Sequence, residues 1–167
     1  MTVRAAMMAG AFILITPALV AGQNRAWVAE LAIGYAGFVD EATKSYLLAG
    51  GGVRRFVTSR LSIGAEVTTM SNSQLLRDRN LMVTGNVVLD LRAPGGARRV
   101  TPFVVGGVGK FWGRDIVRGG PYWSSDPAFT AGAGIRTRVT DRVYATAEYR
   151  VGWELHQRLS ASAGFDW

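Results

Sequence analysis

The feature that most constrains the fold is a period-two alternation of apolar residues with small or polar ones, which recurs in eight segments between residues 25 and 167. From Leu61 to Thr68, leucine, isoleucine, alanine and valine occupy one set of positions, and serine, glycine, glutamate and threonine occupy the other. Successive side chains of a β-strand point to opposite faces, so this period predicts strands. No helical period competes after residue 22. The sequence therefore predicts an all-β protein.

The predicted strands are long and are separated by turn-forming residues. They cover residues 25–39, 45–57, 61–68, 83–91, 101–112, 129–139, 143–153 and 158–167. Globular strands average ~5–6 residues, whereas a tilted strand needs ~9–11 to cross a bilayer. Tight turns are expected at 58–60 and 140–142, and the longest connection, 113–126, is predicted to be a loop. The even number of strands predicts one antiparallel up-and-down barrel, with the looser connections outside the cell.

The first 22 residues predict a cleavable signal peptide. Arg4 precedes an apolar run from Ala5 to Ala21, which is shorter than the ~20 residues of a transmembrane helix, and small residues precede a cleavage site near Gly22. The alternative is an uncleaved N-terminal anchor. We therefore expect a signal peptide over residues 1–22 and one barrel domain over residues 23–167. The sequence contains no cysteine, which excludes a disulfide scaffold.

The net charge of +7 raises nucleic acid as a partner. The basic residues are scattered among turns and alternating segments and do not form a stripe, so we expect no nucleic-acid binding. Scattered surface arginine would suit a negatively charged lipopolysaccharide leaflet. Outer-membrane lipid and lipopolysaccharide are therefore the expected partners.

Alternation alone would also fit a soluble, lipocalin-like barrel, and the polar face distinguishes the two. That face is mainly glycine, serine, threonine and alanine, whereas a solvated exterior should be rich in lysine and glutamate. Its isolated ions are four acids and four bases: Glu30, Glu66, Asp90, Glu148, Lys110, Arg136, Arg138 and Arg150. The lumen of an eight-stranded barrel is just wide enough for side chains, so small residues and paired charges fit there. We interpret these eight residues as an interior charge network of a transmembrane barrel.

Aromatic residues fall near the ends of the predicted strands, as in the girdles of membrane barrels. The residues assigned to the two membrane interfaces are Trp27, Tyr35, Phe103, Phe111 and Trp153. This distribution favours the transmembrane barrel.

The last predicted strand ends on a tryptophan. Its apolar face consists of Leu159, Ala161, Ala163, Phe165 and Trp167. With the segments 50–66, 101–109, 131–134 and 148–150, this strand resembles the β-barrel domain shared by the outer-membrane protein A and opacity-protein groups of small eight-stranded outer-membrane proteins. The resemblance implies an outer-membrane location, periplasmic termini, and recognition of the last strand by the barrel-assembly machinery.

For function, we expect a non-enzymatic, monomeric barrel without cofactor or metal, with a structural or surface-interaction role and a lumen filled by side chains. One alternative is a narrow, low-conductance pore gated by interior Glu and Arg pairs, as described for relatives of the outer-membrane protein A type. Another is adhesion or ligand binding through residues 113–126, which contain Arg114, Arg118, Tyr122 and Trp123.

A remote alternative is a lipid A-modifying enzyme. Some barrels of this size use a membrane-facing serine and histidine for that chemistry, and His156 is the only histidine in this sequence. The His-x-Ser pattern of the deacylase group is missing, because Arg158 stands where its serine would be. We expect His156 to be a solvated loop residue.

Overall fold

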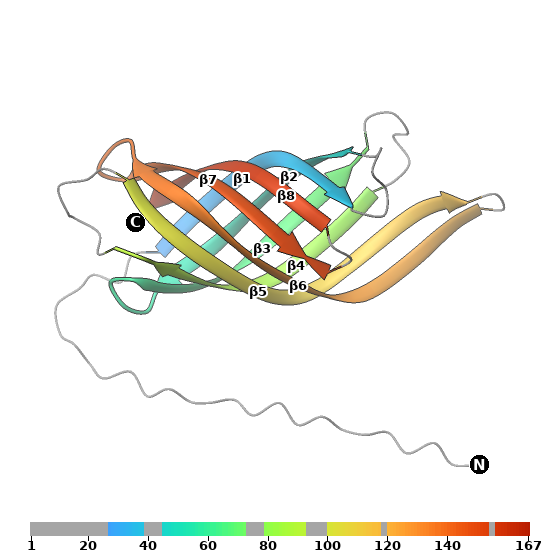
Figure 1. The fold of residues 1–167 in the computed structure, drawn as a ribbon, viewed down its shortest axis with the longest axis horizontal. Helices are drawn as coiled ribbons and strands as arrows, with labels where there is room; N and C mark the ends of the chain where they lie inside the picture. Colours follow the sequence, from blue (N-terminus) through green and yellow to red (C-terminus); the bar gives the residue numbers. More distant parts are fainter. Residues whose placement is uncertain (1–26, 39–44, 73–78, 93–99, 118–119, 154–155) are drawn as a thin grey trace, which may run out of the picture.

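The computed structural model describes residues 27–38, 45–72, 79–92, 100–117, 120–153 and 156–167. The predicted signal peptide lies outside these residues. The strands are β1 (Trp27–Phe38), β2 (Ser45–Phe56), β3 (Leu61–Ser71), β4 (Arg79–Asp90), β5 (Val100–Val117), β6 (Gly120–Arg138), β7 (Val143–Gly152) and β8 (His156–Asp166). Each strand pairs antiparallel with the next, and β8 pairs with β1. The sheet is thus the closed, eight-stranded up-and-down barrel that the sequence predicts (Figure 1).

The alternation in the sequence becomes an alternation between the two faces of the barrel wall. Along β4, exposed and buried positions alternate almost without exception. Large apolar side chains on the outer face remain highly exposed, for example Leu31 at 75% and Val108 at 70%. Exposed apolar side chains of this kind occur on all eight strands, which in water would form a patch far larger than monomeric soluble proteins carry. This outer surface matches the hydrocarbon layer of a bilayer.

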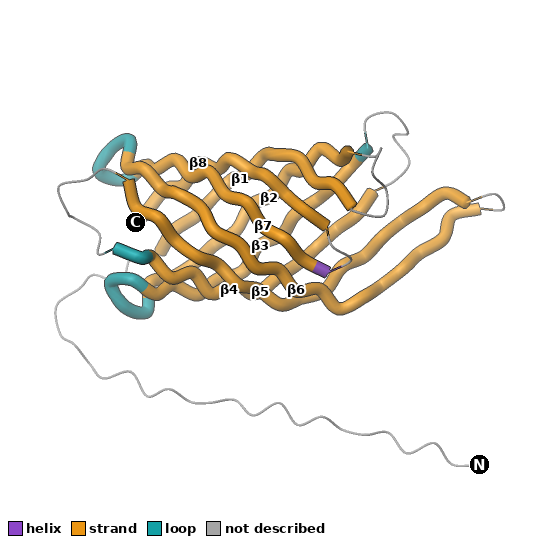
Figure 2. Tube along the Cα trace, in the orientation of Figure 1, coloured by secondary structure: helices purple, strands orange, loops and turns teal. Residues whose placement is uncertain are grey.

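The two ends of the barrel differ. At the end that we call the terminal end, Trp27 and Trp167 exchange backbone hydrogen bonds of 3.1 and 3.0 Å. The short turns from β2 to β3 and from β6 to β7 lie at this same end (Figure 2). In each of these turns a threonine hydroxyl, of Thr58 or Thr140, accepts a backbone N–H at 3.0 Å. These local hydrogen bonds explain why both turns were predictable from sequence.

The opposite end, which we call the hairpin end, carries an extension that the sequence did not predict. Strands β5 and β6 stay in register from Val100↔Thr137 to Val117↔Gly120, so most of the predicted loop 113–126 is a two-stranded ribbon. It projects beyond the rest of the barrel (Figure 1). The glycine, proline and serine residues of this segment favour a loop locally, but the backbone ladder of the hairpin continues through them. Gly120, with φ of 136°, lies where the chain returns.

Two other strands begin earlier than the sequence predicts. Strand β4 begins at Arg79, four residues before the predicted start, and β8 begins at His156, two residues before it. At the end of β8, Asp166 N–H donates to Arg142 O and Trp167 N–H to Trp27 O, so both neighbours hold the closing strand.

Candidate functional site: the lumen

The side chains that point into the barrel form three layers. An ionic layer lies near the terminal end, a second one lies at the centre, and an apolar layer lies toward the hairpin end. We call them the terminal ion cluster (Glu30, Arg54, Asp90, Arg136 and Tyr144), the central ion cluster (Glu66, Glu148, Arg150 and Arg158) and the apolar layer (Ala36, Tyr46, Leu48, Met70, Met82, Phe111 and Ala128).

In the terminal ion cluster, Arg54 is the shared member. Its guanidinium donates to Glu30 at 2.9 Å, to Ser62 at 3.2 Å and to the hydroxyl of Tyr144 at 3.0 Å. The Tyr144 hydroxyl in turn donates to Glu30. The ring of Tyr144 lies over Gly164, its cross-strand partner, where a Cβ would collide with it. One arginine and one tyrosine therefore join β1, β2 and β7 across the lumen.

The second ion pair of this cluster is formed by Arg136 and Asp90. One guanidinium nitrogen of Arg136 contacts both carboxylate oxygens, at 3.0 and 3.1 Å. The guanidinium also lies over the rings of Phe103 and Tyr144, 5.0 and 5.2 Å from their centroids. Desolvated cation–π contacts of this kind contribute about 2 kcal/mol. The arginine is thus held by a carboxylate and two aromatic faces.

The central ion cluster pairs two acids with two arginines. Glu66 accepts from Arg158 at 2.7 Å, from Arg150 at 3.1 Å and from the amide of Asn86 at 2.9 Å. Glu148 accepts from Arg150 at 2.9 Å and lies 3.4 Å from Arg158. Arg158 is 2% exposed. Each carboxylate therefore meets both arginines, an arrangement that compensates the cost of burying four charges.

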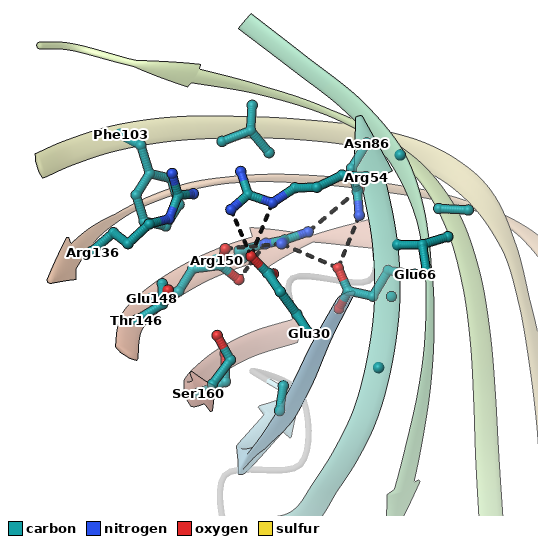
Figure 3. Close-up of a pocket in the computed structure, with 18 residues that line it drawn as sticks. Glu30, Arg54, Glu66, Asn86, Phe103, Arg136, Thr146, Glu148, Arg150 and Ser160 are labelled. Carbon is teal, nitrogen blue, oxygen red and sulfur yellow. Dashed lines mark hydrogen bonds and ion pairs between the residues drawn. The ribbon is translucent and has the colours of Figure 1, made fainter. Parts of the chain in front are cut away.

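A cavity of about 50 Å³ lies between these clusters and is lined by members of both (Figure 3). It has room for a few water molecules. In the view of Figure 3, Glu30 of β1, Arg54 of β2, Glu66 of β3, and Glu148 and Arg150 of β7 point toward one another. Toward the hairpin end the lumen is filled by the apolar layer, in which Leu48, Met70 and Met82 are each 1% exposed.

Six of the eight residues predicted as an interior network lie in these clusters: Glu30, Glu66, Asp90, Arg136, Glu148 and Arg150. Lys110 does not, because on β5 the odd-numbered residues face the lumen and Lys110 lies exposed on the outer face. Arg138 has the inward parity but lies at the rim, where its side chain is 56% exposed and contacts Asp166 at 3.2 Å. The predicted interior position is therefore wrong for Lys110. Arg138 lies at the rim of the lumen and not in its interior.

Two arginines in the clusters were missed. Arg54 lies on β2, whose inward face the sequence left open because Arg54 and Arg55 occupy opposite faces. Arg158 has the same parity as Ser160 and Ser162, the small residues of β8, and this parity was a signal that it faces inward. With these two in place of Lys110 and Arg138, the two ion clusters together hold four acids and four bases.

Three of the predicted interface aromatics, Trp27, Tyr35 and Trp153, are exposed on the outer face. Phe103 and Phe111 are not, since they face the lumen and are 2% and 9% exposed. Phe103 fills the space above Gly134, where an added Cβ would lie 2.5 Å from its Cζ atom. Outward positions of β5 are instead taken by Val104, Gly106 and Val108. The assignment of these two phenylalanines to the membrane interface is therefore wrong.

The five apolar residues of the last strand all lie exposed on the outer face: Leu159, Ala161, Ala163, Phe165 and Trp167. The rings of Phe165 and Trp167 are stacked with their centroids 6.3 Å apart. Their recognition by an assembly machinery remains a prediction.

His156 is not a solvated loop residue. It is the first residue of β8, points into the lumen at 2% exposure, and its Nδ1 lies 2.6 Å from the carbonyl oxygen of Trp153. A lipid substrate diffusing in the bilayer would not meet an imidazole on this inner face. Among the described residues, no group of three or more His, Asp and Glu side chains could hold a metal ion.

Neither a comparison with protein-family models nor one with curated proteins gave a match. Solved structures do match. The N-terminal β-barrel domain of Pseudomonas aeruginosa OprF is 15% identical, with a TM-score of 0.67 over 84% of this chain and 97% of that one. Neisserial surface protein A (NspA) is 13% identical, with a TM-score of 0.67 over 84% and 95%. Ail of Yersinia pestis, in complex with the heparin analogue sucrose octasulfate, is 12% identical, with a TM-score of 0.57 over 86% and 98%.

At these identities the likeness concerns the fold. The chain has the fold of the small eight-stranded outer-membrane β-barrels, as its sequence predicts. Together with the apolar outer face, this defines a membrane β-barrel protein.

Proposed function

We propose that the protein is a non-enzymatic outer-membrane barrel with a sealed lumen, which holds the β5–β6 hairpin at the membrane surface as an element for contact with other molecules. The observation that carries this proposal is the contrast between a filled lumen and a hairpin that extends beyond the barrel wall. The expected setting is a monomer in contact with outer-membrane lipid and lipopolysaccharide, with both termini in the periplasm.

The apolar layer supports the sealed lumen. A hydrated ion that entered between the ion clusters would have to pass Tyr46, Leu48, Met70, Met82 and Phe111, which form one buried cluster. These side chains offer little to replace the hydration shell of an ion, so its transfer through them is costly. This layer, more than the ion pairs, argues against free conduction.

The hairpin supports the surface role. Its ladder continues to Val117↔Gly120, and it presents Trp123 at 66% exposure beyond the apolar belt. An exposed tryptophan on a paired strand provides a large contact area with little loss of side-chain entropy, a common property of binding surfaces. Arg118, which the sequence also assigned to this surface, lies outside the described residues.

A cysteine-labelling experiment tests the location and the orientation together. The chain has no cysteine, so Ser125→Cys on the hairpin and Ser59→Cys in the turn at the terminal end provide single, matched sites. In intact cells a membrane-impermeant maleimide should label Ser125→Cys and should label Ser59→Cys only after the outer membrane is opened. Labelling of the turn site alone would show that the hairpin faces the periplasm and would contradict the proposal.

The second candidate function is a narrow pore. The cavity between the ion clusters favours it, because rearranged Glu and Arg pairs could extend this water-sized space. Single-channel recording in planar bilayers distinguishes the sealed barrel from the narrow pore. A sealed barrel should give no openings, and removal of apolar bulk by Tyr46→Ala with Met82→Ala should create them. Openings in the unmodified protein that disappear in Glu66→Gln would favour the gated pore instead.

A further inference from the structure

Three basic residues share the outer face of the barrel at the hairpin end, on the neighbouring strands β4 and β5. Arg79 on β4 is directly opposite Arg114 on β5, and Arg114 is directly opposite Trp123 on β6. Lys110 lies on the same face of β5, four residues closer to the middle of the barrel, with Trp112 between the two cations. The Arg114 guanidinium lies 5.3 Å from the centroid of the Trp123 ring, and the Lys110 ammonium lies 5.6 Å from that of Trp112.

No ion pair between described side chains neutralises these cations. None of the ion pairs in the described part of the chain involves Arg79, Lys110 or Arg114. Asp126 on β6 is directly opposite Phe111 and shares its inward parity, so it faces away from them. Like charges directly opposite each other on neighbouring strands are destabilising. An anion beside the pair Arg79↔Arg114 would relieve this repulsion, and no ion pair of the described residues supplies one.

The hydrogen bonding of the Arg114 guanidinium also indicates room for a ligand. Its Nε is buried and makes no hydrogen bond within the described residues. The same holds for Nε of Arg136 and Arg158, but both of those arginines hold carboxylates with their other nitrogens. Arg114 forms no ion pair with a carboxylate of the described residues. A buried donor without an acceptor is costly, and a ligand oxygen would relieve that cost.

The position along the barrel axis indicates which anion is available. Val108 and Phe129 are directly opposite each other, are strongly exposed, and belong to the apolar belt, where Phe129 contacts the Trp153 ring edge-to-face at 5.7 Å. Lys110 is the next outward residue of β5 after Val108, so on this strand the cations begin where the exposed aliphatic residues end. In a membrane this is the level of the lipid phosphates. Because the side chains project sideways from the barrel wall, they face neighbouring lipid.

We propose that Arg79, Lys110 and Arg114, flanked by Trp112 and Trp123, bind the phosphate of an anionic lipid headgroup. Two guanidinium groups can each donate more than one hydrogen bond to phosphate oxygens, and Lys110 adds a third positive charge. The two tryptophans hold the cations in place and contact the glycerol or sugar part of the lipid. This site goes beyond the proposed function: it shares Trp123 with the hairpin surface, but it assigns a specific ligand and does not depend on whether the lumen conducts.

The outer face offers a matched control. Arg55 is also exposed and lies over a tryptophan, Trp27, at 5.5 Å, but at the terminal end of the barrel. Its directly opposed partners are Trp27 and Ile63, so no second cation is placed beside it. Arg55→Gln removes the same charge and the same kind of ring contact without touching the proposed site.

The test uses refolded barrel in micelles of an alkyl maltoside, which carries no phosphate. Dihexanoyl phosphatidic acid, dihexanoyl phosphatidylcholine and inorganic phosphate are titrated separately, and binding is followed by amide NMR shifts of residues 79–81, 110–114 and 123–125. We expect phosphatidic acid to bind at least about tenfold more tightly than either other probe. Arg114→Gln and Arg79→Gln should each weaken its binding about tenfold, and Arg55→Gln by less than about twofold.

Heat-modifiable migration on gels confirms that each variant is folded, and the two arginine variants lie on different strands, so a folding defect in one leaves the other informative. Unchanged binding of phosphatidic acid in both variants would overturn the proposal. An equal loss in Arg55→Gln would show general attraction to a basic surface and would also overturn it. Binding of inorganic phosphate as tight as that of phosphatidic acid would make the site one for free anions and would contradict its assignment to lipid.

Discussion

The terminal half and the hairpin half of the lumen are built from inward positions of the same eight strands, yet they are filled in different ways. The two ion clusters extend from the terminal end to the centre, beside a small apolar cluster of Val88, Phe103 and Val105, and the hairpin half contains the apolar layer. In the first, stability depends on every charge having its partner. In the second, it depends on volume and close packing. The lumen is therefore stabilised in two ways along the barrel axis, by paired charges in one part and by close apolar packing in the other.

Glycine explains how the ionic half accommodates long side chains. A Cβ added at Gly132 would lie 2.6 Å from Cγ of Arg150, and one added at Gly64 would lie 2.5 Å from Cβ of Arg54. The missing side chains of these glycines thus provide the space through which the buried arginines run. Inward positions of the apolar layer carry larger residues, such as Leu48 and Met82. Glycine at the inward positions 64 and 132 thus makes room for the arginines of the ion clusters.

The largest effect should come from breaking the charge balance at the centre of the lumen. Arg158→Ala leaves Glu66 and Glu148 to share Arg150, and removal of one partner of a buried ion pair typically costs ~3–5 kcal/mol. Water in the neighbouring cavity should keep the loss toward the lower value. Urea unfolding of the barrel in lipid vesicles, followed by tryptophan fluorescence, measures this free energy.

The double variant Arg158→Met with Glu66→Gln is the control for this prediction. It removes one positive and one negative charge, so it should recover much of the stability that Arg158→Ala loses. If Arg158→Ala costs less than about 1 kcal/mol, the central ion cluster does not obey the rule of paired charges.

A change of volume should be the main effect in the apolar layer. Met82→Ala is expected to destabilise the barrel by ~2–4 kcal/mol, because Met82 is almost fully buried and its loss leaves a cavity. Met82→Leu conserves volume and should cost less than ~1.5 kcal/mol. The same unfolding titration compares them. Equal stability of the alanine and leucine variants would mean that the hairpin half is not close-packed.

The strand pattern allowed most of the fold to be predicted, since period-two alternation is a local property that each strand carries in its own sequence. Which residues of β2 face the lumen was left open, although the register of the tight turn between β2 and β3 determines it. Ser62 faces inward by the clean alternation of β3, and its partner across that turn is Phe56. Phe56 and Arg54 have the same parity, so the turn register places Arg54 in the lumen.

The errors on β5 have a different cause. The prediction assumed that the larger apolar residues face lipid, but Phe103 and Phe111 fill the lumen above small or buried neighbours, and Lys110 faces out. Both faces of a narrow barrel contain apolar side chains, so hydrophobicity alone does not orient such a strand. The length of the β5–β6 hairpin was missed for a related reason. Its ladder depends on pairing between two strands, and local composition does not report it.

An arginine introduced on the outer face of β6 tests whether that face contacts lipid. Ala133 faces outward on β6, directly opposite Val104 and Tyr149, within the apolar belt. Ala133→Arg should cost ~2–4 kcal/mol if the position lies near the bilayer midplane. Thr137→Arg, on the same face but near the terminal end, should cost ~0–1 kcal/mol. Similar small losses at both positions would mean that this face does not meet hydrocarbon.

The smallest effect is expected at the rim, where the lumen charges meet water. Arg136 and Arg138 lie two residues apart on β6, and each contacts one aspartate, Asp90 or Asp166. Arg136 is largely buried, while the side chain of Arg138 is 56% exposed. Exposed ion pairs contribute about 0–1 kcal/mol and are screened by salt, so Arg138→Ala should lose no more than about 1 kcal/mol, and less in 1 M salt.

Arg136→Ala is the matched comparison for the rim variant, because it removes the same side chain one step deeper in the lumen. It leaves Asp90 buried without its arginine and also removes the contacts with Phe103 and Tyr144, so it should cost ~3–5 kcal/mol with little dependence on salt. Unfolding titrations of both variants at low and high salt measure the difference. If the two losses are equal, depth in the lumen does not govern the contribution of an ion pair, and the distinction between its buried clusters and its hydrated rim is wrong.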